Sequence, residues 1–376
     1  MSIDYVEIRN SATDLIGIID AAKSVIWHSS YFGVGDFEIY TEATPEAVEI
    51  LRKYNYVTRP DDIEIGIIEK VYIANNEQDG LMITAAGRFA KSILDRRLIY
   101  KLAGTVNTAT ILRGNVENNI RTLVADNAIA CSFDSKRNFS ILELGAAAGI
   151  PLIIVDENGN AAEKQVSYQN LLEYTESVLK EYGLASIITL DAERRKFIYT
   201  VYEGADRSID NASGNMPILF SQEFDNLIAS EYSCDTTPEK NTALIGGEGE
   251  GVDRFYTLLA GNETDLNRRE IFIDASSINK AYKDENEVEQ EYTNAEYTAL
   301  LKAKGKQDIT PLKISESFAG TIDIVNGNYV YNRDFFLGDI VTVQDNEIGV
   351  YINARITDII EVQDENGYTV DANYQS

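Results

Sequence analysis

The chain has 376 residues, which is enough for two or three domains that each bury a core of their own. A hydrophobic fraction of 44% and a charged fraction of 25% are ordinary for a folded globular protein and argue against a disordered chain. The net charge of −28 argues against a nucleic-acid-binding protein, which needs a basic surface, and it opposes binding to anionic membranes.

Three further features of the sequence narrow the classes of protein to which the chain can belong. The only cysteines, Cys131 and Cys234, are too few for a disulfide framework or a zinc cluster. The N-terminus lacks the basic and apolar regions of a secretory signal, and no run approaches the ~20 apolar residues of a membrane span. The 22 tyrosines often stand in alternating runs, which favours half-buried strands.

The first 100 residues are predicted to be mainly strands joined by turns. Alternating side chains favour strands at 24–31, 37–40, 63–73 and 81–85. A short helix is expected to begin where Thr44 can cap it and Pro45 suits its first position. A second short helix is expected over 89–98.

The middle of the chain changes to a helical period. Apolar residues recur every three to four positions over 109–123, which predicts an amphipathic helix that runs through Gly114. A second helix is predicted over 161–182, with Asn160 and Glu163 as a capping box and Gly183 as its stop. Strands on both sides indicate that these helices pack on sheets.

After residue 187 the pattern returns to strands, apart from one charged helix predicted over 291–304 that ends on Gly305. The acidic segment 282–292 is expected to be a solvated loop or a helix start. Strands are predicted at 320–324, 328–331, 339–343 and 348–362. Asn326-Gly327 and Asn366-Gly367 are hairpin signals.

No pattern in the sequence indicates catalysis, a cofactor or a metal. His28 is the only histidine, no Gly-x-Ser-x-Gly elbow frames a nucleophile, and the lone histidine is expected to be a core or interface residue. The glycine-rich run 246–251 lacks the lysine of a phosphate-binding loop and contains two glutamates, so it is predicted to be a strand end. Acidic tips at 156–160 and 364–367 do not have EF-hand spacing, and turn chemistry explains them.

Several segments together resemble one protein family. In chain order they are YFGVGDFE at 31–38, Gly87-Arg88 with SILDRR at 92–97, FIYTVYEGADRS at 197–208, PILFSQEFDNL at 217–227, NTALIGGEGEG at 241–251, NRREIFIDA at 267–275, and FLGDIV at 336–341 with Arg355-Ile356. Taken in this order, they resemble the siphovirus ReqiPepy-type tail protein family, which is similar to the baseplate hub of long-tailed phages. The last pair looks like the family's C-terminal strand pair.

The resemblance implies an α+β fold with two β-rich, barrel-like modules similar to tail-tube subunits and a helical α+β insert between them. We divide the chain into a β-rich barrel-like module at 1–104, a helical insert domain at 105–190, an α+β module at 191–310 and a C-terminal β module at 311–376.

The resemblance also implies a structural hub at the distal end of a phage tail, or of a tail-like contractile particle such as a bacteriocin. A homotrimeric ring would join the tail tube to the baseplate, with distal tail, tape-measure and spike or receptor-binding proteins as neighbours. The expected location is the tail tip of the virion, after assembly in the host cytoplasm. Alternatives are a cell-wall glycan hydrolase, since 61 acidic residues offer many carboxylate pairs, and a peripheral receptor-binding module.

Four arginines are candidates for the contacts between subunits. In an acidic chain, Arg96, Arg97, Arg268 and Arg269 lie next to predicted elements and could form bidentate salt bridges across an interface, or could equally be ordinary surface arginines. DNA is expected only as cargo that passes through the ring. Because basic groups on the lumen would hold phosphates, we expect Asp and Glu to outnumber Lys and Arg there.

Overall fold

The computed structural model describes residues 2–77, 80–101, 109–155, 160–283, 288–310, 312–323 and 327–375. The chain forms two compact units. Unit 1 comprises Met1–Ile154, Ala161–Tyr232 and Ser317–Ser376, and unit 2 comprises Val155–Asn160 and Ser233–Glu316. The division into four parts drawn from the sequence remains a prediction.

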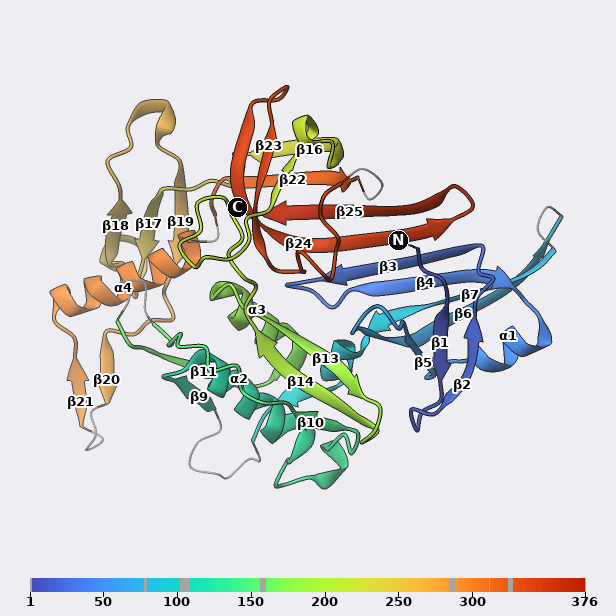
Figure 1. Cartoon of the computed structure of the whole chain (residues 1–376). Coiled ribbons are helices and arrows are strands. Elements are labelled where there is room, and N and C mark those ends of the chain that lie inside the picture. The colour runs from blue at the N-terminus through green and yellow to red at the C-terminus, as the bar shows by residue number, and fades with distance from the viewer. Residues whose placement is uncertain are drawn as a thin grey trace. The chain divides into compact units, whose positions relative to one another are not determined.

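A thirteen-stranded sheet organises unit 1 (Figure 1). The strands from the N-terminal part of the chain are β1 (Val6–Arg9), β2 (Leu15–Ile19), β3 (Ser24–Ser30), β4 (Asp36–Glu42), β5 (Tyr56–Thr58), β6 (Ile65–Asn76) and β7 (Gly80–Phe89). The strands from the later part are β15 (Leu219–Ser221), β16 (Leu227–Asp235), β22 (Ser315–Ile322), β23 (Ile340–Asp345), β24 (Val350–Asp364) and β25 (Gly367–Gln375). Their order is β16-β22-β25-β24-β3-β4-β7-β6-β5-β1-β2, with β23 paired to both β24 and β15.

The two halves of this sheet meet where β3 pairs with β24, in antiparallel register from Asp358 opposite Ser30 to Gln363 opposite Val25. Each half has its own apolar core. Alternating residues of β3 and β4, among them Trp27 and Phe37, face a core with β1 and α1 (Pro45–Ile50). Phe220, Phe318 and other side chains of the later strands form a second core. This confirms the predicted α+β class with β-rich modules.

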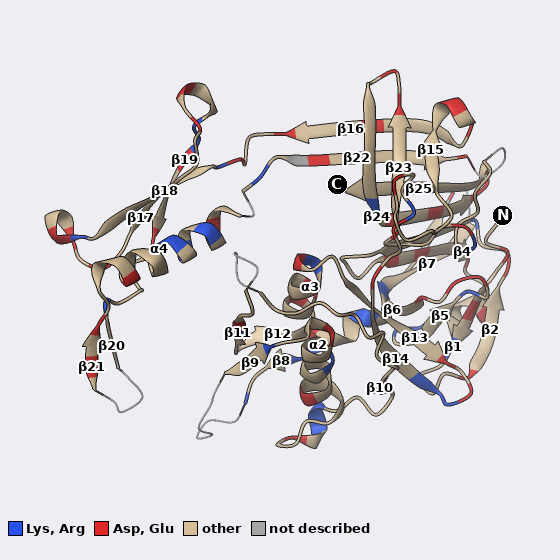
Figure 2. Ribbon diagram, turned by 60° about the vertical axis from the view of Figure 1, so that its left-hand side comes forward, with Lys and Arg blue, Asp and Glu red and all other residues tan. Residues whose placement is uncertain are grey.

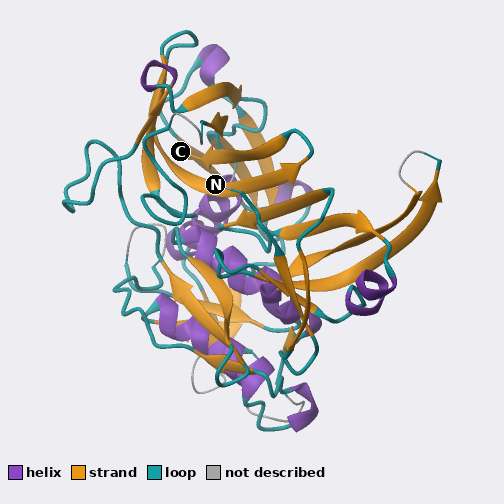
Figure 3. Cartoon of the chain, turned by 45° about the vertical axis from the view of Figure 1, so that its right-hand side comes forward, coloured by secondary structure: helices purple, strands orange, loops and turns teal. Residues whose placement is uncertain are grey.

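A helical layer completes unit 1 (Figure 3). Its elements are the helices α2 (Val116–Val124) and α3 (Leu171–Glu181), the sheet β10-β14-β13 (Leu142–Leu144, Lys196–Tyr202, Ala185–Asp191), and two small strand pairs, β9 (Thr110–Arg113) with β11 (Glu163–Val166) and β8 (Leu98–Ile99) with β12 (Gln169–Asn170). The apolar faces of both helices share one core with β13 and β14, as predicted for helices packed on sheet.

Unit 2 is a small α+β structure. A three-stranded sheet of β17 (Thr242–Gly246), β18 (Tyr256–Ala260) and β19 (Glu270–Asp274) carries α4 (Asn294–Ile309) on one face, and a hairpin of β20 (Ala281–Lys283) and β21 (Glu289–Glu291) is attached. Tyr297 and Leu301 of α4 pack on Ala243, Ile245 and Ile273. The predicted solvated segment 282–292 therefore includes two strands in its described part.

Three predicted helix limits were wrong. Gly114 has a φ of +72° and separates β9 from α2, which begins after the side chain of Asn115 caps it. The helix expected from residue 161 begins at Leu171, with Asn170 rather than Asn160 as its cap, because 163–166 pairs with β9. Gly305 does not end α4. It lies inside the helix, where a Cβ atom would come within 2.3 Å of Ile245.

Other local signals were confirmed. Thr44 accepts a hydrogen bond from the Ala47 amide at 3.1 Å and caps α1, which has Pro45 at its start. The expected short helix after β7 is a 3₁₀ helix over Ala90–Arg96. The Asn366-Gly367 turn joins β24 to β25, whereas Asn326 of the other hairpin signal lies outside the described residues. No described helix has the length and apolar character that would let it cross a lipid bilayer.

Candidate functional site

Residues from three of the family-like segments, together with Gly183, meet at the buried ring of Tyr31. The Tyr31 hydroxyl donates a hydrogen bond to the Gly183 carbonyl at 3.0 Å and accepts one from the Gly204 amide at 3.1 Å. The Arg355 guanidinium lies over the ring, 5.2 Å from its centre, and donates to the Gly338 carbonyl at 2.5 Å. Tyr31 therefore joins segments that are far apart in the sequence.

The segments 204–208 and 336–341 pack against each other beside Tyr31. A Cβ atom at Gly204 would lie 1.8 Å from the Gly338 carbonyl oxygen, so only glycine allows this approach of the two backbones. The buried Asp339 carboxylate accepts from the Ala205 amide and from Arg207 Nε, both at 2.8 Å. These residues of the resemblance therefore have a structural role. The predicted C-terminal strand pair is confirmed as β23 and β24, with Ile340 opposite Arg355.

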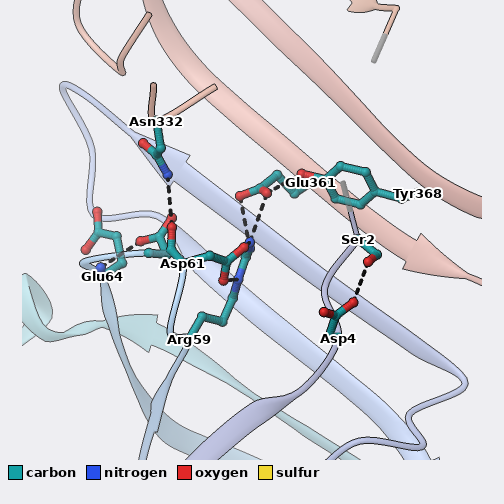
Figure 4. A network of polar contacts seen from close by, with 9 residues as sticks. Ser2, Asp4, Arg59, Asp61, Glu64, Asn332, Glu361 and Tyr368 are labelled. Atoms are coloured by element: carbon teal, nitrogen blue, oxygen red, sulfur yellow. Dashed lines mark hydrogen bonds and ion pairs between the residues drawn. The ribbon is translucent and has the colours of Figure 1, made fainter. Parts of the chain in front are cut away.

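A buried ion pair links the two halves of the large sheet (Figure 4). Arg59 donates two hydrogen bonds to the Glu361 carboxylate, at 2.9 and 3.0 Å, and the two side chains are 1% and 4% exposed. Arg59 also binds Asp61 at 2.6 Å and lies 5.3 Å from the centre of the Trp27 ring, while Tyr368 donates to Glu361. The sequence gives no local sign of this pair, because 302 residues separate its members.

His28 has carboxylate partners on two neighbouring strands. Its Nε2 lies 3.1 Å from Asp358 of β24, and its Nδ1 lies 3.6 Å from Asp36 of β4. The hydrogen bond to Asp358 raises the pKa of His28, burial opposes this, and the charges of both aspartates add to it. His28 therefore belongs to the polar contacts that join β24, β3 and β4.

The first predicted arginine pair lies at the end of the 3₁₀ helix in unit 1. Arg96 is 43% exposed at its side chain and has Glu69 at 3.9 Å. Arg97 donates to the carbonyls of Arg137 and Arg96 and stacks on Phe139, 3.8 Å from the ring centre. Of the two, Arg96 keeps more of its guanidinium available to another molecule.

The second predicted pair lies in unit 2, beside β19. Arg268 forms an ion pair with Glu270 at 2.6 Å, and both side chains are partly exposed. Arg269 forms an ion pair with Glu239 at 3.1 Å and donates to the Thr236 carbonyl. The two arginine pairs lie in different units, and their part in subunit contacts stays a prediction.

Apolar side chains cover the face of the unit 2 sheet that is opposite α4. Leu244 stands between Leu258 and Phe272 in the register of β18, β17 and β19, and the three side chains are 43%, 45% and 50% exposed. Arg254 lies 5.4 Å from the centre of the Phe272 ring. We call this surface the outer face of unit 2. Exposed apolar clusters of this kind mark interaction surfaces.

The large sheet has an edge strand at each end, β2 and β16, and no further strand of the described chain pairs with either outer edge. On β2, Leu15, Ile16 and Ile18 are 52%, 40% and 46% exposed. On β16, Ile228 is 63% exposed. An apolar edge strand offers unpaired backbone groups to another chain, and natural proteins normally cover or charge such edges.

The glycine-rich run after β17 forms a bend. Arg254 donates to the carbonyls of Gly246 and Gly247 at 3.0 and 3.1 Å, and Gly249 and Gly251 have φ angles of +101° and +56°. The predicted strand end is confirmed by β17, which ends at Gly246. Within the described ranges, no group of three or more His, Cys, Asp or Glu side chains is placed to hold a metal ion.

Comparison with known proteins agrees with this architecture. The family described as Siphovirus ReqiPepy6 Gp37-like protein matches residues 5–373. A tail protein from Neisseria meningitidis MC58 has a similar structure, with a TM-score of 0.56, 14% identity, and coverage of 99% of this chain and 96% of that one. The 43 kDa tail protein of prophage MuSo2 from Shewanella oneidensis has a TM-score of 0.58, 12% identity and 98% coverage of both chains. No curated protein matches in sequence. The chain belongs to the Siphovirus ReqiPepy6 Gp37-like family, and its fold is that of phage tail proteins.

Proposed function

We propose that this tail protein is a structural hub at the distal end of a phage tail or tail-like contractile particle. Three copies form a ring that joins the tail tube to the baseplate. The observation that carries the proposal is the large sheet of unit 1, which spans both β-rich modules and ends in two different open edges, β2 and β16. A ring requires a heterologous interface, in which one face of a copy meets a different face of the next.

The exposed apolar side chains supply the stabilising part of such contacts. The β2 edge with Leu15, Ile16 and Ile18, and the outer face of unit 2, are the surfaces that neighbouring chains cover. Arg96 and Arg268 are the better placed of the four predicted arginines for polar contacts at a rim, since both are partly exposed. Unlike Arg97 and Arg269, neither donates to a backbone carbonyl of the described residues. The neighbours are the tail tube, distal tail and baseplate proteins, the tape-measure protein, and a spike or receptor-binding protein.

The ring has no catalytic role in this proposal, and DNA passes through it without being held. Lumen-facing strands then carry more Asp and Glu than Lys and Arg, because basic groups would retain phosphates by counterion release. Support comes from the excess of 61 acidic over 33 basic residues. Figure 2 shows acidic residues on strands and turns of unit 1, and basic residues along α4 of unit 2.

The test is an image of the assembled particle in which this chain carries a C-terminal label. Three labels around the tail axis at the distal end are expected. A single copy, an isologous dimer, or labels at the periphery would contradict the proposal, and the last result would favour a receptor-binding module.

A pair of substitutions tests the edge contact. Ile16→Lys places a charge on the β2 edge and is expected to abolish incorporation of the chain into particles. Ile348→Lys is the matched control, because Ile348 is 50% exposed in the turn between β23 and β24, and neither of these strands is a neighbour of β2 in the sheet. Equal incorporation of the two variants would show that the β2 edge is not an interface.

A further inference from the structure

Unit 1 contains a cavity of about 480 Å³ that the hub role does not use. It lies where the loop between β5 and β6, the strands β13 and β14, and the loop before β23 come together. Its wall combines carboxylates, aromatic rings and one buried hydroxyl, among them Asp62, Glu64, Tyr202, Tyr331, Phe336 and Ser29. A volume of this size is within the range of about 300–1,000 Å³ that is usual for ligand sites.

Among the described residues, the Asp62 and Glu64 carboxylates of this wall form no ion pair with the cations beside them, because those cations are bound to other carboxylates. Arg59 is engaged by Glu361 and Asp61, and Arg207, which also lines the cavity, is engaged by Asp339. The Glu64 amide donates to the Asp62 carboxylate at 2.7 Å. None of the described residues donates a hydrogen bond to the Glu64 carboxylate or forms an ion pair with it, and no dashed line reaches this carboxylate in Figure 4.

Lys91 is the remaining cation near Glu64, and it forms an ion pair with Glu176 at 2.8 Å. Burial raises the pKa of Glu64 to about 8, the charge of Asp62 adds to the rise, and Lys91 opposes it. Burial also raises the pKa of Asp62, against the influence of Arg59. Burial therefore raises the pKa of two carboxyl groups in this wall, and a further positive charge beside them would favour their ionised forms.

An independent observation points to a missing partner at the same wall. The Ser29 hydroxyl is buried, Ser29 is 2% exposed, and its Oγ has no hydrogen-bond partner. Buried polar groups in folded proteins are nearly always paired, so an unpaired hydroxyl in a cavity wall indicates a position for a ligand group. A hydroxyl can accept a hydrogen bond from a donor-rich ligand.

We propose that this cavity binds a guanidinium group, carried by an arginine side chain of a neighbouring polypeptide or by a small free compound. The guanidinium has five N–H donors and no acceptor, which suits the carboxylates of Asp62 and Glu64 and the Ser29 hydroxyl. It is weakly hydrated and stacks on aromatic rings, for which Tyr202 lines the cavity, whereas the Phe336 ring already has the Arg207 guanidinium 5.8 Å from its centre. The proposal goes beyond the hub role, because the cavity is complete within a single copy of unit 1.

The ionisation of Glu64 sets the direction in which the affinity for a guanidinium changes with pH. The groups that face Glu64 are Asp62 on the same loop, Lys91 after β7, and the rings of Tyr202 on β14 and Tyr331 before β23. A pKa of about 8 means that the ionised fraction of Glu64 rises from about 0.1 at pH 7 to about 0.9 at pH 9. Affinity for a guanidinium is therefore expected to increase about tenfold over this interval.

The experiment is isothermal titration of the full chain with N-acetyl-arginine amide at pH 7 and pH 9. N-acetyl-citrulline amide, which is neutral and nearly isosteric, is expected not to bind. A pentapeptide with a central arginine and flanking glycines distinguishes a guanidinium carried by a polypeptide from one carried by a small free compound. Binding of the peptide indicates a side chain of a partner, and binding of the amino-acid amide alone indicates a small compound.

Substitutions locate the site. Glu64→Gln and Asp62→Asn are each expected to weaken arginine binding at pH 9 at least tenfold, and Glu250→Gln, at an exposed position in unit 2, is expected to leave it unchanged. Fluorescence of Trp27, the only tryptophan, checks that unit 1 remains folded. Absence of arginine binding at pH 9, equal binding of citrulline, or equal affinity of the Glu64→Gln variant would overturn the proposal.

Discussion

The pair between Arg59 and Glu361 gives a quantitative test of how the two halves of the large sheet are held together. The substitution Arg59→Met removes the guanidinium but keeps most of the apolar volume. It leaves Glu361, whose side chain is 4% exposed, with only the Tyr368 hydroxyl among the donors described above. Removing one member of a buried pair typically costs about 3–5 kcal/mol, because the remaining charge is uncompensated.

The assay is urea unfolding followed by the fluorescence of Trp27. This tryptophan is fully buried, is the only one in the chain, and lies against Arg59, so its signal reports on the unit that contains the pair. Arg333→Met is the matched control. Arg333 is exposed and forms an ion pair with Asp334, so its removal is expected to change the free energy of unfolding much less than Arg59→Met does.

The double variant Arg59→Met, Glu361→Gln separates the two possible reasons for a loss. With both charges removed, the free energy of unfolding should recover part of the loss seen with Arg59→Met alone. If Arg59→Met is no more destabilising than Arg333→Met, the two halves of the sheet do not depend on this pair. If the double variant is less stable than the single one by a further full increment, the uncompensated charge is not the cause.

Three further predictions concern Gly204, His28 and the absence of catalysis. Gly204→Ala should lower stability by about 3 kcal/mol in urea unfolding, because its Cβ would overlap the Gly338 carbonyl; an unchanged midpoint would contradict this close approach. Asp358 raises the pKa of His28, so their contact stabilises the fold fully at pH values below the unfolded-state pKa of 6.5. This stabilisation is lost as the pH rises through the higher pKa of the folded state. His28→Gln should therefore lower the free energy of unfolding by up to about 1 kcal/mol at pH 5.5 and by less at pH 8.5. The purified chain should release no fragments from peptidoglycan, and turnover that Glu64→Gln abolishes would favour the hydrolase alternative.

Local signals predicted structure well where the local chain alone decides it. Thr44 followed by Pro45 is sufficient for the start of α1, and Asn366-Gly367 is sufficient for a hairpin. The start of α3 shows the limit of such signals. Asn160 and Asn170 are each followed by a glutamate three positions later, and only the pairing of 163–166 with β9 decides in favour of the second.

The contacts that hold the halves of unit 1 together could not be read from the sequence. The β3–β24 pairing and the Arg59–Glu361 pair join residues that are near only in the folded chain. Gly305 illustrates the same point at one residue. Its glycine signal predicts a helix end, yet the close packing of α4 on Ile245 needs a glycine within the helix. The barrel-like character of the β-rich modules was predicted from the resemblance to the family and not from local patterns. Gly204 and Gly338 show why local patterns were insufficient, because a Cβ atom at Gly204 would clash with the Gly338 carbonyl and not with a neighbour in sequence.

Several arginines of this chain are bound to groups of the same chain, which leaves fewer of them for contacts between copies. Arg59, Arg97, Arg207 and Arg269 are engaged within their own copy, by carboxylates or by backbone carbonyls. The chain also has 28 more acidic than basic residues, so copies of it would repel one another, most strongly at low salt. In the proposed ring, most of the attraction between copies would then come from apolar contacts, for which the β2 edge offers exposed side chains.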